Sequence, residues 1–391
     1  MTSPPIRIDA PWVAAPPTRA VCAAIEAGGH AILFVGGCVR NALLGQPVAD
    51  IDLATDARPE AVVALAKAAG LNPVPTGIDH GTITVVAAGR PFQVTTFRRD
   101  VETFGRHAVV AFSDDIAEDA ARRDFTLNAL YARPDGTVVD PLGGLPDLRA
   151  GRVRFVGDPD ARIAEDSLRI LRFVRMTAWY GDPAAGLDRD GLAACAARQE
   201  GLDGLSRERV GAEVTKLLAA PDPAPAVAAM AATGILARVL PGADPTALAP
   251  LVHLECGRPP RWQRRLAALG WRSEWGDALR LSRAERRALE AVAAALAAGE
   301  PPAVAAYRHG AEAALDAALV RAASVGAPLP ADLGAELARG AVAAFPLRAA
   351  DLALSGPALG TMLRRLEEAW IASDFALDAE ALRLLDVGGR G

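Results

Sequence analysis

The segment at residues 31–55 constrains the fold most, because an apolar run, a glycine pair and two alternating aspartates follow one another there. The apolar run at residues 31–35 is typical of a buried strand. The glycine pair at residues 36–37 permits a sharp turn and a close approach of the backbone to a ligand. Residues 38–44 predict a helix whose free N–H groups point at the same spot, where Arg40 adds a donor for phosphate oxygens. The segment therefore predicts an anion-binding turn.

Two aspartates follow on a strand predicted at residues 49–53. Charged and apolar residues alternate there, so we expect Asp50 and Asp52 on one face and Ile51 and Leu53 in the core. Neighbouring carboxylates repel each other unless a cation lies between them, and oxygen ligands beside phosphate select Mg²⁺ or Mn²⁺. The implied chemistry is metal-assisted nucleotidyl or phosphoryl transfer. A glycine pair or a DxD alone is usually only a turn or a strand end, so the prediction depends on their occurrence together.

A third segment, residues 119–130, places Arg123 and Asp124 ahead of an apolar helical run. A carboxylate beside guanidinium groups can accept a hydrogen bond from a ribose hydroxyl, while the arginines meet phosphate or sugar oxygens. The alternative is an Arg–Asp pair that only braces a surface helix.

A fourth segment, residues 160–180, carries Asp166, Arg169 and Arg172 at intervals of three, and Arg175 extends the row. This spacing predicts one shared helix face. An Asp acceptor beside an Arg donor matches the pairing edge of cytosine or adenine, whereas uracil and guanine reverse both polarities. The alternative is an ion pair within a solvated helix. The helix predicted after it, at residues 205–218, is either a charged connection or a ligand contact.

The pattern along the chain indicates about two to four domains. Short strands at residues 83–87 and 92–97 and a helix at residues 58–69 predict a small α+β domain up to about residue 148, and beyond residue 161 the pattern is almost entirely helical. The net charge of −5 argues against nonspecific coating of nucleic acid. Scattered cysteines, an N-terminus without a signal pattern and the lack of a long apolar run predict a cytoplasmic protein without membrane anchoring.

Taken together, these motifs resemble the class II family of CCA-adding tRNA nucleotidyltransferases and bacterial poly(A) polymerases, within the polymerase-β-like superfamily. The matching motifs are GGxVRD at residues 36–41, DxD at 50–52, RRDFT at 122–126, DxxGG at 140–144 and EDxxR at 165–169. The resemblance implies an α+β fold in which a nucleotidyltransferase head with a small mixed sheet precedes a helical neck, body and tail. The implied domains are a catalytic head (1–148), a base-recognising neck (149–220), a body (221–300) and a tRNA-binding tail (301–391).

The resemblance also implies roles for single residues. Asp50 and Asp52 would be the catalytic pair that binds Mg²⁺, Gly37 and Arg40 would hold the triphosphate, and Arg123 with Asp124 would read the sugar. A second set in the EDxxR helix would serve as an amino-acid template for C and A. That set consists of Asp166 and Arg169, braced by Arg172 and Arg175.

In the family the tRNA 3′-hydroxyl attacks the α-phosphate in line, and metal ions activate it and stabilise the leaving pyrophosphate. Residues 100–115, with Gly105 and Arg106, fall where the family has a flexible loop linked to the switch from C to A addition. Two positions depart from the family pattern. Asn41 stands where the first motif usually ends in Asp, so a charge is lost, and Gln93 stands where many relatives have Glu, a candidate third carboxylate.

The leading hypothesis is addition of CCA to tRNA 3′ ends from CTP and ATP without a nucleic-acid template. Its partners would be tRNA, CTP and ATP, its cofactor Mg²⁺, and no obligatory protein partner is evident. A poly(A) polymerase that uses ATP on general RNA ends would share the fold and the chemistry, and specialisation for CC or for A alone remains open. A hypothesis from a different class is an inert tRNA-binding protein that retains the nucleotide pocket, motivated by Asn41 and Gln93.

Overall fold

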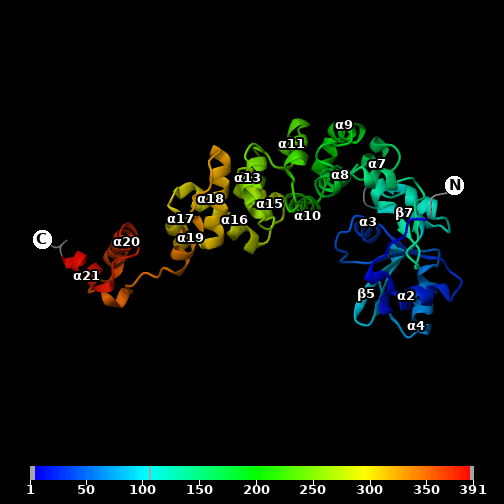
Figure 1. Cartoon of the computed structure of the whole chain (residues 1–391), viewed down its shortest axis with the longest axis horizontal. Coiled ribbons are helices and arrows are strands. Elements are labelled where there is room, and N and C mark those ends of the chain that lie inside the picture. The colour runs from blue at the N-terminus through cyan, green and yellow to red at the C-terminus, as the bar shows by residue number, and fades with distance from the viewer. Residues whose placement is uncertain (1–4, 105–106, 388–391) are drawn as a thin grey trace. The chain divides into compact units, whose positions relative to one another are not determined.

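The computed structural model describes residues 5–104 and 107–387 and separates into two compact units, Met1–Pro241 and Gly242–Gly391 (Figure 1). The predicted loop residues Gly105 and Arg106 lie outside the described residues. The finer division into head, neck, body and tail stays a prediction.

A mixed sheet of seven strands forms the first part of the N-terminal unit, in the order β3-β4-β5-β2-β1-β8-β9. Neighbouring strands run antiparallel except β2 and β5, which are parallel. The strands are β1 (Ile32–Val35), β2 (Asp52–Thr55), β3 (Asn72–Gly77), β4 (Thr82–Ala87), β5 (Arg90–Thr96), β8 (Tyr131–Ala132) and β9 (Val138–Val139). The sheet, followed by helices, confirms the predicted α+β class.

The strands predicted at residues 83–87 and 92–97 are present as β4 and β5. Alternate residues of β4 are buried, and Phe92 and Val94 of β5 are fully buried, which is the pattern expected of a sheet with one covered face. Two helices, α2 (Pro16–Glu26) and α4 (Pro59–Ala68), pack on each other (Figure 1). Both also pack on β4. The helix predicted at residues 58–69 is therefore confirmed.

A separate ribbon of two antiparallel strands, β6 (Arg98–Phe104) and β7 (His107–Phe112), follows β5. The backbone pairs from Arg98 with Phe112 to Phe104 with His107. Most of residues 100–115, which the resemblance to the family suggested as a flexible loop, therefore forms paired β-strands.

The remaining helices of the N-terminal unit surround the sheet or follow it. They are α1 (Pro11–Ala14), α3 (Gly37–Leu43), α5 (Ile116–Ala121), α6 (Leu145–Arg149), α7 (Pro159–Glu165), α8 (Leu168–Tyr180), α9 (Arg189–Ala197), α10 (Arg207–Leu218), α11 (Ala224–Ala232) and α12 (Ile235–Val239). Helix α8 packs against both α10 and α11. The predicted helix at residues 205–218 is α10, and Ser206 occupies its N-cap position without a side-chain capping bond.

The C-terminal unit is helical in its described residues, as predicted. Its helices are α13 (Leu248–Glu255), α14 (Trp262–Ala268), α15 (Ser273–Ala278), α16 (Arg283–Ala298), α17 (Pro302–His309), α18 (Ala311–Val325), α19 (Leu333–Val342), α20 (Gly356–Ala372) and α21 (Ala379–Val387). Throughout the described part of the chain, every helix is too short or too polar to span a lipid bilayer.

A buried cluster of charges ties together α13, α14 and α18. Arg264 donates to Glu255 at 2.8 Å and to Asp316 at 3.1 Å, and Arg265 donates to Glu255 at 2.7 Å. All four side chains are 5% exposed or less. Because removal of one partner would leave a buried charge unpaired, these ion pairs make the three helices depend on one another.

Helices α17 and α19 approach closely at Gly340. A Cβ atom at this position would lie 1.9 Å from the backbone oxygen of Ala303, a distance that no side chain can occupy. Gly334, on the same helix, faces open space. A side chain is therefore excluded at position 340 and has room at position 334.

We predict that Gly340→Ala destabilises the C-terminal unit by about 2–4 kcal/mol, because the added methyl group forces α17 and α19 apart. Gly334→Ala is the matched control and should stabilise α19 by up to about 1 kcal/mol, because alanine favours a helix over glycine. Thermal and urea unfolding followed by circular dichroism would measure both. Equal stability of the two variants would contradict the close approach.

Candidate active site

The glycine pair forms the turn predicted between β1 and α3. Gly36 has φ 71° and ψ −123°, a conformation that residues with a side chain rarely adopt. An added Cβ would also face Nη1 of Arg123 at 3.5 Å. Gly37 is the first residue of α3, whose predicted start at residue 38 is correct within one residue.

A cavity of about 290 Å³ opens beside this turn. It is lined by Val35, Gly36, Gly37, Arg40, Asp52, Arg123, Asp124, Asn128, Arg172, Arg175 and Met176. The structure thus brings together seven of the ten predicted site residues. Asp50, Asp166 and Arg169 do not line it. Four arginines and two carboxylates are among its lining residues.

Asp52 is the first residue of β2 and is half-buried at the cavity wall. Burial raises its pKa, Arg123 lowers it, and the nearby charge of Asp50 raises it again. Asp50 itself is exposed and precedes the strand, so the prediction that it lies within a strand is wrong. The reason is that β1, the neighbour of β2, turns away at Gly36 and leaves residues 49–51 without a partner from β1.

The core side of this segment agrees with the prediction, because Ile51 and Leu53 are 3% and 0% exposed. Gln93 of β5 pairs in parallel register with Asp52, so both side chains leave the sheet on the same face. The position expected to hold a third carboxylate therefore lies beside Asp52 and carries an exposed amide.

This donor set fits a Mg²⁺ ion that also has ligands from substrate. Within the described residues there is no cluster of three or more His, Cys, Asp or Glu side chains able to hold a metal. Burial is the main cause of the raised pKa of Asp52, and the charge of Asp50 adds to it, so a cation bound between the two carboxylates would be favourable. Mg²⁺ commonly takes one or two carboxylates and completes its shell with water and phosphate oxygens.

Asp124 is the centre of the hydrogen bonding in the cavity. One carboxylate oxygen accepts from the backbone N–H of Phe125 at 2.9 Å and from Asn128 at 3.0 Å, and the other accepts from Nε of Arg172 at 2.8 Å. Burial alone would raise its pKa, but the Arg172 guanidinium and the other donors hold the pKa below the usual value of 3.8. Both oxygens are therefore engaged by the protein rather than facing a ribose.

Arg123 is fixed in the same way by Asp119 and Tyr131, which accept from it at 3.0 Å each. Arg175 donates to Glu213 of α10 at 2.5 Å. Together with Arg172, these arginines form carboxylate pairs that fix their positions and neutralise most of their charge.

Arg40 differs from the other arginines of the cavity. Its side chain donates to Asn41 at 2.9 Å, to the Tyr180 hydroxyl at 2.8 Å and to Asn128, and it lies over the Tyr180 ring at 3.9 Å. None of these three hydrogen-bond partners, which belong to the described residues, carries a charge. Arg40 is only 8% exposed, and its burial lowers its pKa. A buried cation whose partners carry no charge is a natural site for an anion.

Asp166 and Arg169 lie elsewhere, and the predicted single helix face is wrong. Asp166 has an extended backbone, with φ −153° and ψ 105°, and it separates α7 from α8 while its side chain accepts from the N–H of Leu168 at 3.1 Å. Its other oxygen accepts from Arg209 at 2.6 Å, beside a second depression of about 420 Å³. Arg169 instead donates to Glu165 and to the backbone oxygen of Arg162.

Several residues of the site were not identified as such from the sequence. Tyr180, Asn128 and Glu213 hold arginines, and Arg162 donates to the backbone oxygens of Arg122 and Arg123. The charged residues along residues 205–218 were the one feature of the sequence that could have indicated this role for α10. Glu213 on this helix contacts Arg175 of α8, and Arg209 contacts Asp166, which lies between α7 and α8. Tyr180 and Asn128 gave no comparable signal, because their contacts cross distant parts of the sequence.

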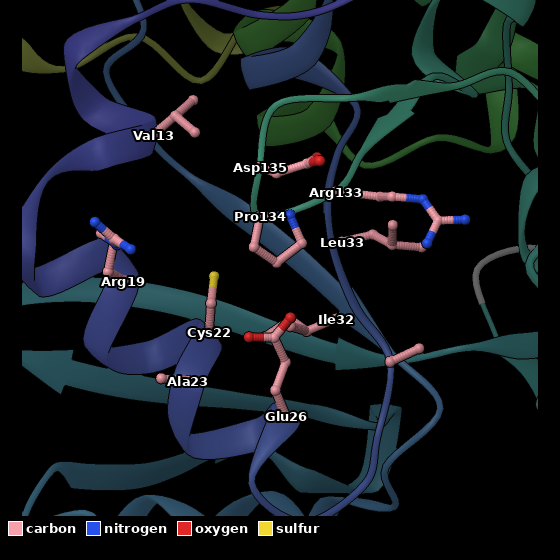
Figure 2. Close-up of a pocket in the computed structure, with 11 residues that line it drawn as sticks. Val13, Arg19, Cys22, Ala23, Glu26, Ile32, Leu33, Arg133, Pro134 and Asp135 are labelled. Carbon is pink, nitrogen blue, oxygen red and sulfur yellow. The ribbon is translucent and has the colours of Figure 1, made fainter. Parts of the chain in front are cut away.

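A larger cavity, of about 550 Å³, lies at the other end of β1 beside α2 (Figure 2). Figure 2 shows Arg19 and Arg133 on its walls together with Glu26 and Asp135. These charges balance, and Asp135 is already paired with Arg7. The smaller cavity is the candidate site because it brings together the glycine turn, Asp52 and Arg40, whose hydrogen-bond partners are neutral.

Known protein families match this chain in two regions. The model of the poly A polymerase head domain matches residues 32–154, and that of the probable RNA and SrmB-binding site of polymerase A matches residues 187–246. The CCA-adding enzyme of Geobacillus thermodenitrificans is 38% identical over 245 residues, which is 62% of this chain and 55% of that protein. Human mitochondrial CCA tRNA nucleotidyltransferase 1 is 42% identical over 190 residues, 48% of this chain and 44% of that protein.

A solved structure extends the match along the chain. The crystal structure of the Bacillus stearothermophilus CCA-adding enzyme in complex with CTP has a TM-score of 0.74 and 30% identity, over 92% of this chain and 94% of that one. The chain belongs to the class II CCA-adding enzyme and poly(A) polymerase family. It spans about half the length of the curated CCA-adding relatives it matches. The cavity at the glycine turn is lined by residues of the matched head region and of α8.

We predict that Asp124→Asn lowers the free energy of unfolding of the N-terminal unit by about 2 kcal/mol near neutral pH, because Arg172 loses its charged partner. The pKa of Asp124 is lower in the folded state, so its contribution is present above about pH 4 and is lost as the pH falls through its folded value. The variant should therefore lose less additional stability than the parent between about pH 5 and about pH 3.

Urea unfolding at several pH values would measure both effects. Asp160→Asn is the control, because Asp160 pairs with Arg198 at 2.7 Å while 51% exposed, and its loss should cost less than about 0.5 kcal/mol. Equal acid sensitivity of the parent and Asp124→Asn would contradict the assigned ion pair.

Proposed function

We propose that this protein adds CCA to the 3′ ends of tRNA from CTP and ATP, without a nucleic-acid template. The single observation that carries the proposal is Arg40, a buried guanidinium with neutral partners, in the same cavity as Asp52. This pairing suits a ligand that joins polyphosphate to a divalent cation. Family membership narrows that ligand to a nucleoside triphosphate, since the relatives are named as CCA-adding enzymes and one is solved with CTP.

Each part of the site takes a role under this proposal. Gly37 and Arg40 hold the triphosphate, and Arg123 lies next to Asp52 where sugar or phosphate oxygens would come. Asp124 acts by fixing Arg172 rather than by touching the sugar itself, since both of its oxygens are engaged.

Base selection is proposed to use Asp166 and Arg169, an acceptor and a donor that suit the edges of cytosine and adenine. In the present structure Asp166 is paired with Arg209 and Arg169 with Glu165, so base binding would exchange these partners. Arg175, which is fixed by Glu213, braces the same helix. The head is proposed to catalyse, the neck to read the base and the tail to bind tRNA.

The reaction proposed is in-line attack of the terminal tRNA 3′-hydroxyl on the α-phosphate. The new bond joins the 3′-oxygen to the α-phosphorus, the bond from that phosphorus to the bridging oxygen breaks, and pyrophosphate leaves, while the hydroxyl proton passes to water. Mg²⁺ held by Asp50 and Asp52 would lower the pKa of the hydroxyl and neutralise charge on the phosphates. Arg40 would stay with the departing β- and γ-phosphates. No covalent enzyme intermediate is required.

Extension of tRNA at single-nucleotide resolution would test this function. We expect tRNA lacking its terminus to gain CCA and then stop when CTP, ATP and Mg²⁺ are present, while an unrelated RNA stays unextended. Asp52→Asn should reduce the rate by about a thousandfold or more, because the carboxylate pair is broken. Long A tails on either RNA would identify a poly(A) polymerase instead, and binding of tRNA without extension would identify an inert binder.

Gln93 provides a second test, of the metal site. We predict that Gln93→Glu tightens Mg²⁺ or Mn²⁺ binding about tenfold, because a third carboxylate would lie beside Asp52. Thr84→Glu is the matched control, because Thr84 pairs with Gln93 one strand further from Asp52 and a charge there should change the affinity little. Equilibrium titration of Mn²⁺ in the absence of RNA would measure this. Equal affinities for both variants would contradict the assigned metal position.

A further inference from the structure

Asn41, the residue that follows Arg40 on α3, joins two parts of the site. Its Oδ1 accepts from Nε of Arg40 at 3.1 Å and from Nη2 of Arg40 at 2.9 Å, and its Nδ2 donates to the backbone oxygen of Pro47 at 3.0 Å. This amide orientation is fixed by chemistry, because a guanidinium only donates and a carbonyl oxygen only accepts. The side chain is therefore satisfied on both sides in a way that a carboxylate could not match.

The second contact of Asn41 is with the loop that carries Asp50. Its backbone oxygen accepts from the N–H of Gln46 at 2.8 Å, and its side chain holds Pro47, three positions before Asp50. Residues 44–51 between α3 and β2 are thus tied at two successive points to the helix that carries Arg40. An aspartate at position 41 would set one oxygen against the Pro47 carbonyl with no hydrogen between them.

The first contact concerns charge. Asp at position 41 would be a carboxylate in direct contact with the Arg40 guanidinium and would neutralise it, as Asp119 neutralises Arg123 and Asp124 neutralises Arg172. The neutral amide orients Arg40 through the same geometry without placing a carboxylate in direct contact with its guanidinium. A nucleotide that brings phosphates to Arg40 then has no internal carboxylate to displace.

We propose that Asn41 is a positioning residue that reserves the Arg40 charge for the nucleotide triphosphate group and fixes the loop that carries Asp50. The proposal rests on the proposed function, in that it takes CTP or ATP as the ligand of this cavity.

Equilibrium binding of CTP and CMP without RNA and without metal would test the charge. Asn41→Asp should reduce the ratio of CTP to CMP affinity at least about tenfold, because the new carboxylate competes with the phosphates for Arg40. Asn41→Leu, of similar size and uncharged, should keep the ratio within about threefold of the parent. Asn128→Asp, which places a carboxylate on Arg40 from another side, should repeat the loss of Asn41→Asp. Because this variant also removes the donor to Asp124, Asn128→Leu, which removes the same donor without adding a charge, is its control and should keep the ratio.

Amide hydrogen exchange at residues 45–50 would test the loop. Both Asn41→Asp and Asn41→Leu lose the bond to Pro47, so exchange there should rise about tenfold, whereas Asn128→Asp should leave it unchanged. Circular dichroism would confirm that each variant folds. If Asn41→Asp does not fold, Asn128→Asp still tests the effect of a carboxylate on Arg40.

An unchanged CTP to CMP ratio in the aspartate variants would overturn the assignment of charge, and unchanged exchange in both Asn41 variants would overturn the assignment of position. If the effects appear but the parent adds no CCA to tRNA, the proposed function fails while this inference stands. If the parent binds no CTP at all, both fail.

Discussion

The ion pair between Asp124 and Arg172 is the interaction on which the rest of the site depends. Asp124 follows the end of α5 at the edge of the sheet domain, and Arg172 belongs to α8, so their contact closes the cavity between the two. The additional donors from Phe125 and Asn128 hold the carboxylate still, which in turn holds the guanidinium. Beside this pair, the buried rings of Phe125 and Phe173 pack with Phe155, so the ion pair and apolar packing join the same two segments.

A division among the arginines follows from this pairing. Those matched to carboxylates act as structural supports, because their charge is largely cancelled where it stands. Arg40 is oriented by two amides and a phenol, which fix a guanidinium without cancelling it. A protein that binds a highly charged ligand needs both kinds, because rigid walls hold the shape of the site while an uncompensated charge attracts the ligand.

The parts of this arrangement that the sequence predicted are those set by neighbours along the chain. The strand, the glycine turn and α3 could be predicted because an apolar run is followed directly by two glycines. The burial of Ile51 and Leu53 could be predicted because polar and apolar residues alternate along residues 50–53. The motif order and the resemblance led to the family, which the comparisons confirm. The assigned roles of the site residues are still predictions.

The parts that failed are those set by contacts between distant segments. The spacing of Asp166, Arg169 and Arg172 suggested one helix face, but Asp166 caps the start of α8 and turns to α10, a choice that spacing alone cannot reveal. Asp50 was placed in a strand although β1 turns away too early to pair with it. The partners of Arg40 come from residues as distant as Tyr180, so no local pattern could indicate them.

The buried charges of the C-terminal unit have a consequence for how alanine-rich helices find their alignment. Alanine side chains are small and uniform, so two such helices could slide along each other by a turn with little change in apolar contact. Glu255 and Asp316 are met by Arg264 at distinct atoms, and hydrogen bonds of this kind exist at only one register. The ion cluster thus fixes the register of α13, α14 and α18, because the apolar surfaces alone would tolerate several alignments.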